Sequence, residues 1–391
     1  MNPHIGRRLR YGMVGGGPGA FIGAVHRMAA ALDGEYELVA GAFASRPGRS
    51  REQGRLLGLD ARRTYDSFQD MAQGEAALGE DRRIDAVSVV TPNHLHHPVA
   101  KTFLRAGFHV ICDKPMTTTL ADAEDLCRTV EATGLIFALT HNYTGYPMVR
   151  EARHLVRAGR LGTVRKVVAE YPQGWLGTRL EQTGHKQASW RQDPARAGAS
   201  SAVADIGSHV HSLVGYVTGL EIGEVFAELS SLVPGRVMED DATMLVRFVG
   251  GARGVYSASQ VSTGEENGLA LRVYGEDAGL LWRQERPNEV RLLPAEGPRE
   301  TLTRGSPGLS PAARHATRLP PGHPEGFIEA FANLYRGAGR VIGAAIAGCE
   351  ADPLDHDFPD HRDGARGMHF IESVLESAAE GRWVDMAGYR P

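Results

Sequence analysis

Three features are scarce in this sequence of 391 residues. It has only three cysteines, at positions 112, 127 and 349, and no C-x-x-C pair, which argues against a disulfide scaffold and a structural zinc site. No apolar run approaches the roughly 18 residues that a membrane span needs. The first residues lack the apolar stretch of a signal peptide, so we expect a cytoplasmic protein.

A strong charge of one sign is also missing. The 43 basic and 47 acidic side chains leave a formal net charge of -4, which gives no electrostatic reason to expect nucleic acid or an anionic membrane as partner. A hydrophobic share of 42% and a charged share of 23% are typical of a soluble globular protein. A small molecule is therefore the expected partner, and the chain length predicts two domains.

The N-terminal part predicts an α/β fold. Between RYGMVGG (10–16) and IFALTHN (136–142), short apolar runs alternate with amphipathic stretches, which is the pattern of repeated β-α units. The apolar runs are rich in Val, Ile and Ala without strict alternation, as expected for strands covered by helices on both faces. We therefore predict a Rossmann domain with a doubly wound parallel sheet over residues 1–140.

The remainder, residues 141–391, predicts a second domain of the α+β class. Longer strand candidates, from VFAELSSLV (225–233) to NEVRLL (288–293), are joined by short turns, which favours an open, mainly antiparallel sheet. The region 294–324 is rich in Pro, Gly and Ser and predicts a long surface loop. Two helical patterns close the chain.

A glycine-rich turn lies between the first predicted strand and helix. Gly15, Gly17 and Ala20 form one frame of a G-x-G-x-x-[GA] pattern, and Gly17, Gly19 and Gly23 form another. Glycine suits such a turn because it accepts positive φ and lets a pyrophosphate approach the backbone at the helix N-terminus. A lone glycine pattern could be only a flexible loop, but its place in the first β-α unit favours dinucleotide binding by Gly15, Gly17, Gly19 and Ala20.

The end of the second predicted strand leaves the choice between NAD and NADP open. An acidic residue there normally binds the ribose hydroxyls of NAD, but the stretch ELVAGAFASRPGRS (37–50) has none after the strand. Ser45 and Arg46 suit the 2'-phosphate of NADP, whereas Arg46 equally suits stacking on the adenine of NAD. The predicted cofactor is therefore NAD or NADP.

Three side chains predict the chemistry. Lys114 follows a buried strand, where its N–H donors suit a developing alkoxide. Asp205 and His209 are four residues apart, so on a helix they share one face, and histidine is the usual base for an alcohol proton. Taken singly, Asp205 fits a helix cap and His209 a core histidine. Their combination with Lys114 and the glycine turn favours a catalytic site.

Four stretches together resemble the Gfo/Idh/MocA oxidoreductase family over nearly the whole chain: TPNHLH (91–96), CDKP (112–115), WRQDPARAG (190–198) and DIGSHVHSL (205–213). The resemblance implies an N-terminal Rossmann domain and a C-terminal domain for substrate binding and oligomerisation, whose open sheet often forms the interface. It also implies an NAD(P)-dependent enzyme that oxidises or reduces sugars, cyclitols or related polyols, and a homodimer or homotetramer.

The resemblance also assigns residues. The E-K-P signature of the family corresponds to Asp113, Lys114 and Pro115, its catalytic Asp and His to Asp205 and His209, and its T-P-N-x-x-H stretch to the cofactor-binding residues Thr91, Pro92, Asn93 and His96. The sequence departs from the family in three places. Asp113 replaces a glutamate and is expected to bind the cofactor, the glycine turn is about three residues longer before Gly23 and His26, and Ser212 stands where many members have an acid.

Substrate contacts are predicted from aromatic and basic side chains. A Trp face and a guanidinium suit a sugar ring and its hydroxyls, which favours Trp190 and Arg191, although packing between domains is an equal reading of Trp190. Tyr143 follows the last Rossmann strand and is predicted to contact substrate or to join the core. The clusters NHLHHP (93–98) and DPLDHDFPDHRDG (352–364) predict a cofactor loop and a polar turn, so no metal is expected.

Three functions follow from these residues. The leading hypothesis is hydride transfer between a nicotinamide and a secondary alcohol of a sugar, glycoside or cyclitol. The second is an NAD-dependent glycoside hydrolase that works by transient oxidation and elimination. The third is a nucleotide-binding sensor without turnover, against which the intact Lys114, Asp205 and His209 argue.

Overall fold

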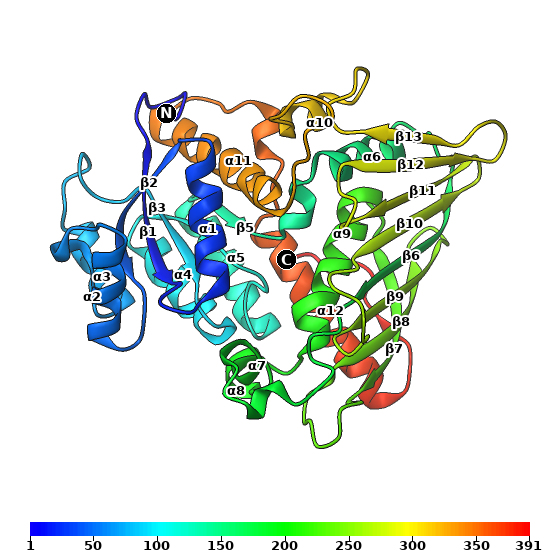
Figure 1. Cartoon of the computed structure of the whole chain (residues 1–391), viewed down its shortest axis with the longest axis horizontal. Coiled ribbons are helices and arrows are strands. Elements are labelled where there is room, and N and C mark those ends of the chain that lie inside the picture. The colour runs from blue at the N-terminus through cyan, green and yellow to red at the C-terminus, as the bar shows by residue number, and fades with distance from the viewer. The chain divides into compact units, whose positions relative to one another are not determined.

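The computed structural model describes all 391 residues, although at position 47 it describes the backbone alone. The chain falls into two compact units (Figure 1). Unit 1 comprises Met1–Thr140 and Phe331–Ala365, and unit 2 comprises His141–Ala330 and Arg366–Pro391. The chain therefore passes between the units three times. The first crossing follows residue 140, and Phe331–Ala365, from the later part of the chain, belongs to unit 1.

Unit 1 is built on a five-stranded parallel sheet of order β2-β1-β3-β4-β5. Its strands and connecting helices are β1 (Leu9–Gly15), α1 (Phe21–Leu32), β2 (Tyr36–Ala42), α2 (Pro47–Leu56), α3 (Phe68–Ala76), β3 (Ala86–Val90), α4 (His96–Arg105), β4 (His109–Cys112), α5 (Leu120–Thr133) and β5 (Phe137–Leu139). Every residue of β3 and β4 is buried, which explains their continuous apolar character. The predicted Rossmann-type sheet is confirmed, and the strand order reverses between β1 and β3, where ligands bind in such sheets.

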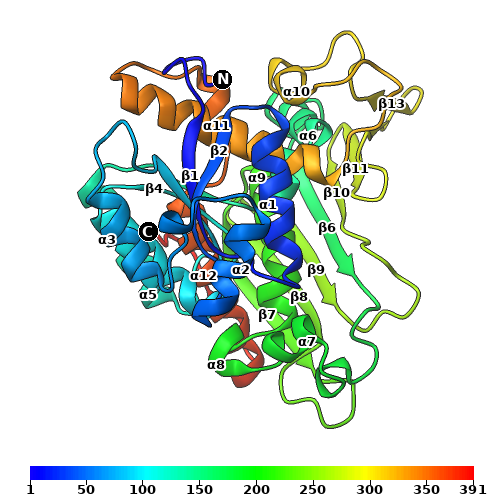
Figure 2. The same cartoon turned by 60° about the vertical axis from the view of Figure 1, so that its left-hand side comes forward.

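Helix α11 (Phe327–Ala347) joins unit 1 from far along the chain, and Figure 2 shows it beside α1. The Tyr335 hydroxyl lies 2.7 Å from His26 Nδ1 and 2.8 Å from the Ser88 hydroxyl. The Tyr36 hydroxyl donates to the Tyr335 carbonyl at 2.8 Å. The side chains of His26, Ser88 and Tyr335 are almost fully buried. Since buried polar groups need partners, this network explains why the segment packs with the N-terminal sheet.

A buried histidine in unit 1 predicts acid sensitivity. His109 begins β4, is 8% exposed and accepts a hydrogen bond from the Ile136 amide through Nδ1 at 2.9 Å. Burial lowers the pKa of His109 to about 4. In the unfolded chain, His109 binds a proton at about pH 6.5, whereas in the folded chain it does so only near pH 4. The free energy of unfolding therefore decreases as the pH falls below about 6.5.

We expect this one group to remove about 2 kcal/mol of unfolding free energy between pH 7 and pH 5. Urea denaturation of wild type and His109→Gln at both pH values measures the effect, because glutamine can accept the same hydrogen bond without titrating. The loss between pH 7 and pH 5 should be smaller in the variant. Equal losses in the two proteins would contradict the prediction.

Unit 2 contains a nine-stranded sheet of order β13-β12-β11-β10-β6-β9-β8-β7-β14. The strands are β6 (Val164–Pro172), β7 (Ile222–Ser230), β8 (Asp241–Phe248), β9 (Arg253–Ser259), β10 (Ala270–Gly275), β11 (Ala278–Arg283), β12 (Glu289–Pro294), β13 (Glu300–Thr303) and β14 (Val384–Asp385). All pairings are antiparallel except that of β6 with β9, so the predicted mainly antiparallel sheet is confirmed.

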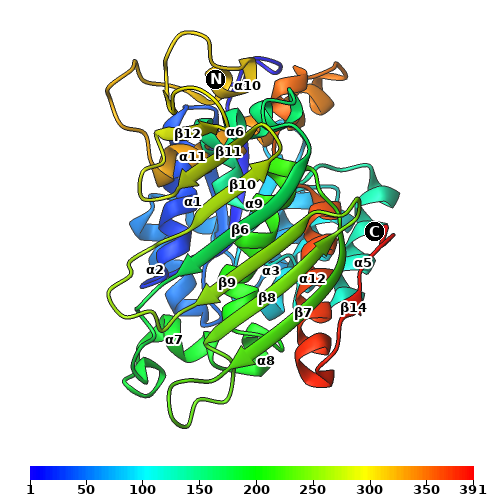
Figure 3. The same cartoon turned by 90° about the vertical axis from the view of Figure 1, so that its right-hand side faces the viewer.

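One face of this sheet is covered by helices. The helices of unit 2 are α6 (Pro147–Arg157), α7 (Lys186–Arg191), α8 (Pro194–Ala197), α9 (Ser208–Thr218), α10 (Pro311–Ala316) and most of α12 (His361–Glu380). Figure 3 shows the opposite face of the sheet without a helix in front of it. Alternate residues of β8 are buried and exposed, as expected for a sheet covered on one side. In the described part of the chain, no helix combines the length and apolar character needed to cross a membrane.

The predicted surface loop at 294–324 is only partly a loop, because it contains β13 and α10. A buried ion pair organises the rest of it. Arg304 and Glu325, 3% and 2% exposed, are joined at 2.8 Å, and Arg304 also donates to the carbonyls of Leu319, Pro320 and His323. The composition of this region predicted a loop. It could not reveal the ion pair, because Arg304 and Glu325 are 21 positions apart in the sequence.

Candidate active site

The glycine-rich turn connects β1 to α1. Gly15, Gly16 and Gly19 have φ of 88°, 70° and 74°, values that favour glycine. Helix α1 begins after Ala20, whose side chain caps none of its N–H groups. These N–H groups and the positive end of the helix dipole suit a pyrophosphate.

The glycines of the turn differ in how closely their surroundings approach them. A Cβ at Gly15 would lie 2.6 Å from the Val90 carbonyl oxygen, and one at Gly23 would lie 2.3 Å from Gly16 Cα. Gly19, in contrast, has no heavy atom within 4 Å of its Cβ position, so its backbone is open to a ligand. The roles of the glycine motif are therefore divided between the two predicted frames: Gly23 provides the close packing of helix on turn.

We expect Gly23→Val to weaken NADH binding at least tenfold, because the added carbons would push α1 away from Gly16 and displace its N–H groups. Fluorescence titration with NADH measures the dissociation constant. Gly215→Ala is the matched control, since a Cβ there meets no atom within 4 Å. Unchanged NADH affinity in a folded Gly23→Val protein would show that this packing does not shape the nucleotide site.

The predicted nucleotide-selecting residues follow the end of β2. Ser45 and Arg46 are exposed, and Arg46 immediately precedes α2. The loop before them is fixed by Ser50, whose hydroxyl accepts from the Phe43 amide at 3.0 Å and donates to the Tyr65 carbonyl at 2.8 Å. The predicted pair therefore lies on a defined loop, accessible to a ligand.

The predicted T-P-N-x-x-H residues follow β3. Thr91 and Pro92 are half-buried, and Asn93 is 7% exposed. The His96 ring is 1% exposed and lies 2.9 Å from the Thr91 carbonyl and 2.7 Å from the Pro115 carbonyl. His96 thus holds the ends of β3 and β4 together.

Asp113 and Lys114 follow β4 as predicted. One Asp113 oxygen accepts from the Lys114 amide at 2.9 Å and from the Thr140 hydroxyl at 3.0 Å, and it lies 3.8 Å from His26 Nε2. Burial tends to raise the pKa of Asp113, but His26, Lys114 and His96 outweigh it and hold this pKa at about 2. Asp113 is therefore an anion that fixes the backbone of the half-buried Lys114.

Asp205 and His209 lie in unit 2, near the start of α9. Asp205 belongs to a turn of π-helix, Val203–Gly207, that leads directly into α9. Such turns are rare and frequently occur at functional sites. An added Cβ at Gly207 would meet its nearest atom, in Val203, at 3.4 Å, so crowding within the chain does not require this glycine.

The Asp205 carboxylate is held by two side chains. Its Oδ2 accepts from Arg191 Nε at 3.1 Å and from Gln260 Nε2 at 2.9 Å. The capping positions of the π-helical turn and of α9 are Ala202 and Gly207, so Asp205 is not the cap of this helix. Arg191 contacts the predicted catalytic aspartate. The Arg191 guanidinium also lies over the rings of Trp190 and Trp175, at 4.3 Å and 6.0 Å.

His209 lies among aromatic rings. It is 7% exposed, and its ring centroid is 4.7 Å from that of Tyr143 and 5.4 Å from that of His141. The Tyr143 hydroxyl is hydrogen-bonded to Tyr171, and Asn267 bonds both tyrosines. Burial raises the pKa of Tyr143, so this hydroxyl stays protonated. Tyr143 packs directly against the predicted catalytic imidazole.

Several residues of these sites were missed from the sequence. They are Trp175, Tyr171, Gln260, Asn267 and Tyr335. No motif marks them, because each meets its partner through the tertiary fold. His26 differs from these residues, because its G-x-x-H spacing from Gly23 is visible in the sequence. Within the described residues, no group of three or more His, Cys, Asp or Glu is arranged to hold a metal ion.

The glycine turn at the switch point of a parallel sheet is typical of dinucleotide-binding domains of the Rossmann class. Residues 9–141 match the NAD-binding Rossmann domain of the Gfo/Idh/MocA oxidoreductases, and residues 149–281 match the C-terminal domain of that family. The chain belongs to the Gfo/Idh/MocA family.

Three relatives show how closely the chain follows its family. An oxidoreductase structure from Sinorhizobium meliloti is 46% identical, with a TM-score of 0.87, over 97% of this chain and 100% of that one. An inositol dehydrogenase homologue from Azotobacter vinelandii, crystallised with NADH and myo-inositol, is 34% identical over 98% of both chains, with a TM-score of 0.89. Levoglucosan dehydrogenase from Pseudarthrobacter phenanthrenivorans is 25% identical over 97% of this chain and 98% of its own length. The protein is therefore similar to NAD-binding dehydrogenases along its whole length.

Proposed function

We propose that this oxidoreductase transfers hydride between NAD(P) and a secondary alcohol of a sugar, glycoside or cyclitol. The observation that carries the proposal is the pair on one helix: Asp205, held by two side chains, and His209 one turn later. Full-length similarity to a homologue crystallised with NADH and myo-inositol supports the substrate class. Similarity to levoglucosan dehydrogenase supports an anhydrosugar or pyranose equally well.

Each residue has a distinct role in this proposal. The N–H groups of the glycine turn would hold the pyrophosphate, and Thr91, Asn93 and Asp113 would hold the nicotinamide side. The bound nicotinamide would supply the hydride acceptor or donor. Lys114 would donate hydrogen bonds to the reacting oxygen, and His209 would remove or return its proton. Asp205, held by Arg191 and Gln260, would orient that pair.

The proposal is tested with a panel of sugars, glycosides and cyclitols, followed at 340 nm with NAD and with NADP. We expect reduction of the nucleotide by at least one secondary alcohol. Cleavage of a glycoside without net NADH, by protein that retains its nucleotide through purification, would instead support the hydrolase hypothesis. NADH binding without turnover of any compound would support the sensor hypothesis.

Two finer proposals concern nucleotide choice and assembly. Arg46 would contact the adenosine part of the cofactor, and comparing the two nucleotides with Arg46→Ala decides which one it favours. The helix-free face of the nine-stranded sheet would form the interface of a homodimer or homotetramer. Two large hydrophobic side chains of its strands, Leu245 and Tyr274, are 44% and 40% exposed. Light scattering of wild type and Leu245→Glu tests this assembly.

A further inference from the structure

The segment 173–192, here named the tryptophan segment, carries Trp175, Trp190 and Arg191. It begins after β6 and contains only a short 3-10 turn and α7. Its start is anchored to the sheet, because the Gln173 amide donates to the carbonyl of Ser259, the last residue of β9, at 2.7 Å. Within the described part of the chain, the other backbone hydrogen bonds of 177–192 close locally. Side chains must therefore determine where this segment lies.

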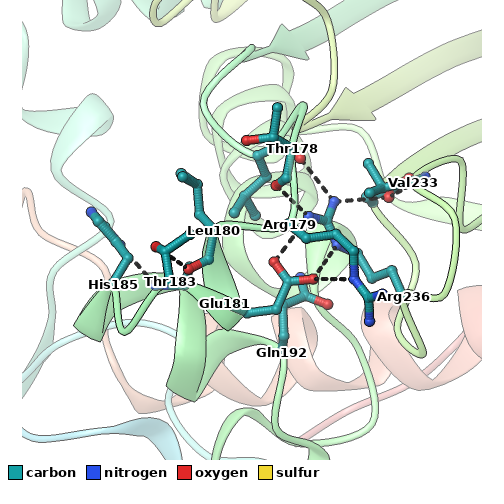
Figure 4. Close-up of polar contacts among 12 residues, drawn as sticks. Thr178, Arg179, Leu180, Glu181, Thr183, His185, Gln192, Val233 and Arg236 are labelled. Atoms are coloured by element: carbon teal, nitrogen blue, oxygen red, sulfur yellow. Dashed lines mark hydrogen bonds and ion pairs between the residues drawn. The ribbon is translucent and has the colours of Figure 1, made fainter.

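Arg236 is the main side chain that holds it (Figure 4). The Arg236 side chain is 1% exposed, and each of its five N–H donors has an acceptor. Two of these acceptors are backbone carbonyls of the tryptophan segment, at Leu176 and Thr178, both at 2.9 Å. Two are the carboxylate oxygens of Glu181, at 3.1 Å and 3.3 Å. Only a planar fork of donors can satisfy this arrangement.

The fifth acceptor connects Arg236 to its own loop. Arg236 donates to Asp240 at 2.9 Å, and Asp240 also accepts from the amides of Leu232 and Val233. The loop is itself compact, since Asp240 is fully buried. The Arg236 side chain is therefore held in one position. A second contact, from Arg179 of the segment to the Gly235 carbonyl at 3.0 Å, fixes the segment to the same loop.

The same loop holds the start of the helix that carries Asp205. Glu239 accepts hydrogen bonds from the Ser200 hydroxyl at 2.6 Å, the Ser201 amide at 2.7 Å and the Val203 amide at 3.2 Å. Glu239 is 8% exposed, so these contacts are shielded from water. Residues 236–240 thus bind the tryptophan segment with one side chain and the first turn of the catalytic helix with another.

The two parts meet again at Asp205, where Arg191 from the end of the tryptophan segment donates to its carboxylate. A closed circuit results, which runs from Arg236 through the segment to Arg191 and Asp205, and returns along the helix to Glu239. A shift of the segment would move Trp175, Trp190 and Arg191 together, relative to Asp205.

We propose that Arg236 is a positioning residue for substrate recognition, which acts by fixing the tryptophan segment in place beside Asp205. This inference rests on the proposed function, because it assigns the segment to the sugar or polyol side of the site. The Arg236 side chain is 1% exposed, so it would act through the segment that it holds and not by binding the substrate itself. Its removal should therefore affect substrate affinity first and nucleotide affinity not at all.

The test uses Arg236→Lys and Arg236→Met in the full-length protein. Lysine keeps the charge but cannot present the fork, so both variants should raise KM for the best polyol about tenfold or more, with kcat lowered no more than about threefold. The Kd for NADH should stay at the wild-type value. Hydrogen exchange should become faster at the amides of 177–186 but not in β8 and β9. Arg165→Met, which removes a two-thirds exposed arginine paired with Glu276, is the matched control and should change none of these.

A double variant separates positioning from general stability. Glu181→Gln should raise KM to a smaller extent, and Arg236→Met with Glu181→Gln should raise it no further than Arg236→Met alone, because both act through one contact. A lowered melting temperature with KM and segment exchange unchanged would overturn the inference. Wild-type protein inactive on every polyol would overturn the proposed function instead. Hydrogen exchange would then decide the role of Arg236 by itself, and unchanged exchange in 177–186 would refute it.

Discussion

Replacing Lys114 by alanine is expected to lower kcat/KM about 10³-fold, with little change in the Kd for NADH. Removing a single donor to a developing oxyanion costs about 10²–10³-fold, and loss of the positive charge adds to that cost. The backbone of Lys114 is fixed, because Asp113 accepts a hydrogen bond from the Lys114 amide and another from the Thr140 hydroxyl. Steady-state kinetics at 340 nm and fluorescence titration measure the two quantities.

Lys101→Ala is a suitable control for this experiment. Lys101 also lies in unit 1 and is paired with Asp125 at 2.5 Å, but it belongs to α4 rather than to a strand end. Lys114→Arg should recover little activity, since a guanidinium has a different shape from an ammonium group. A Lys114→Ala enzyme within threefold of the wild-type kcat/KM would remove this lysine from the proposed chemistry.

The second large effect is expected at His209. His209→Gln should lower kcat for alcohol oxidation about 10²–10⁴-fold, the usual contribution of a general base. A general base must be unprotonated for alcohol oxidation and protonated for carbonyl reduction, so the two directions should respond to pH in opposite senses in the wild type. In the variant, this dependence on pH should disappear, because glutamine does not titrate.

Profiles of kcat/KM against pH, in both directions, distinguish a base from a packing residue. Loss of ring packing against Tyr143 and His141 would lower activity by a factor that does not depend on pH. His154→Gln, an exposed position on α6, is the control and should retain the wild-type profile. A His209→Gln profile with the same pH dependence as the wild type would assign the proton transfer to another group.

Much of the fold was predictable because the patterns that determine it are local. The buried strands of unit 1 and the alternating strands of unit 2 are visible in the sequence, and both sheets are confirmed. The family and its NAD-binding domain are confirmed as well. The spacing of Asp205 and His209 predicted that they lie one helical turn apart. In the structure, both belong to the continuous helical stretch that leads into α9, while their catalytic roles stay predictions.

What the sequence did not reveal depends on contacts between distant residues. Tyr335 meets His26 across 309 positions, and Gln260 meets Asp205 across 55. Arg236 lies in an unremarkable turn, where an arginine is normally solvated, and only the fold surrounds it with five acceptors. Patterns of spacing describe single elements, so they cannot identify partners that the tertiary structure brings together.

The course of the chain sets a limit on dissecting this enzyme. A fragment ending at residue 140 would contain every strand of the nucleotide-binding sheet, yet it would leave His26, Ser88 and the Tyr36 hydroxyl without the partners that α11 supplies. Exposing these groups would favour aggregation or a loosened fold. An independently folding half would have to carry residues 331–365 as a grafted extension, and domain exchange among relatives would have to transfer both pieces together.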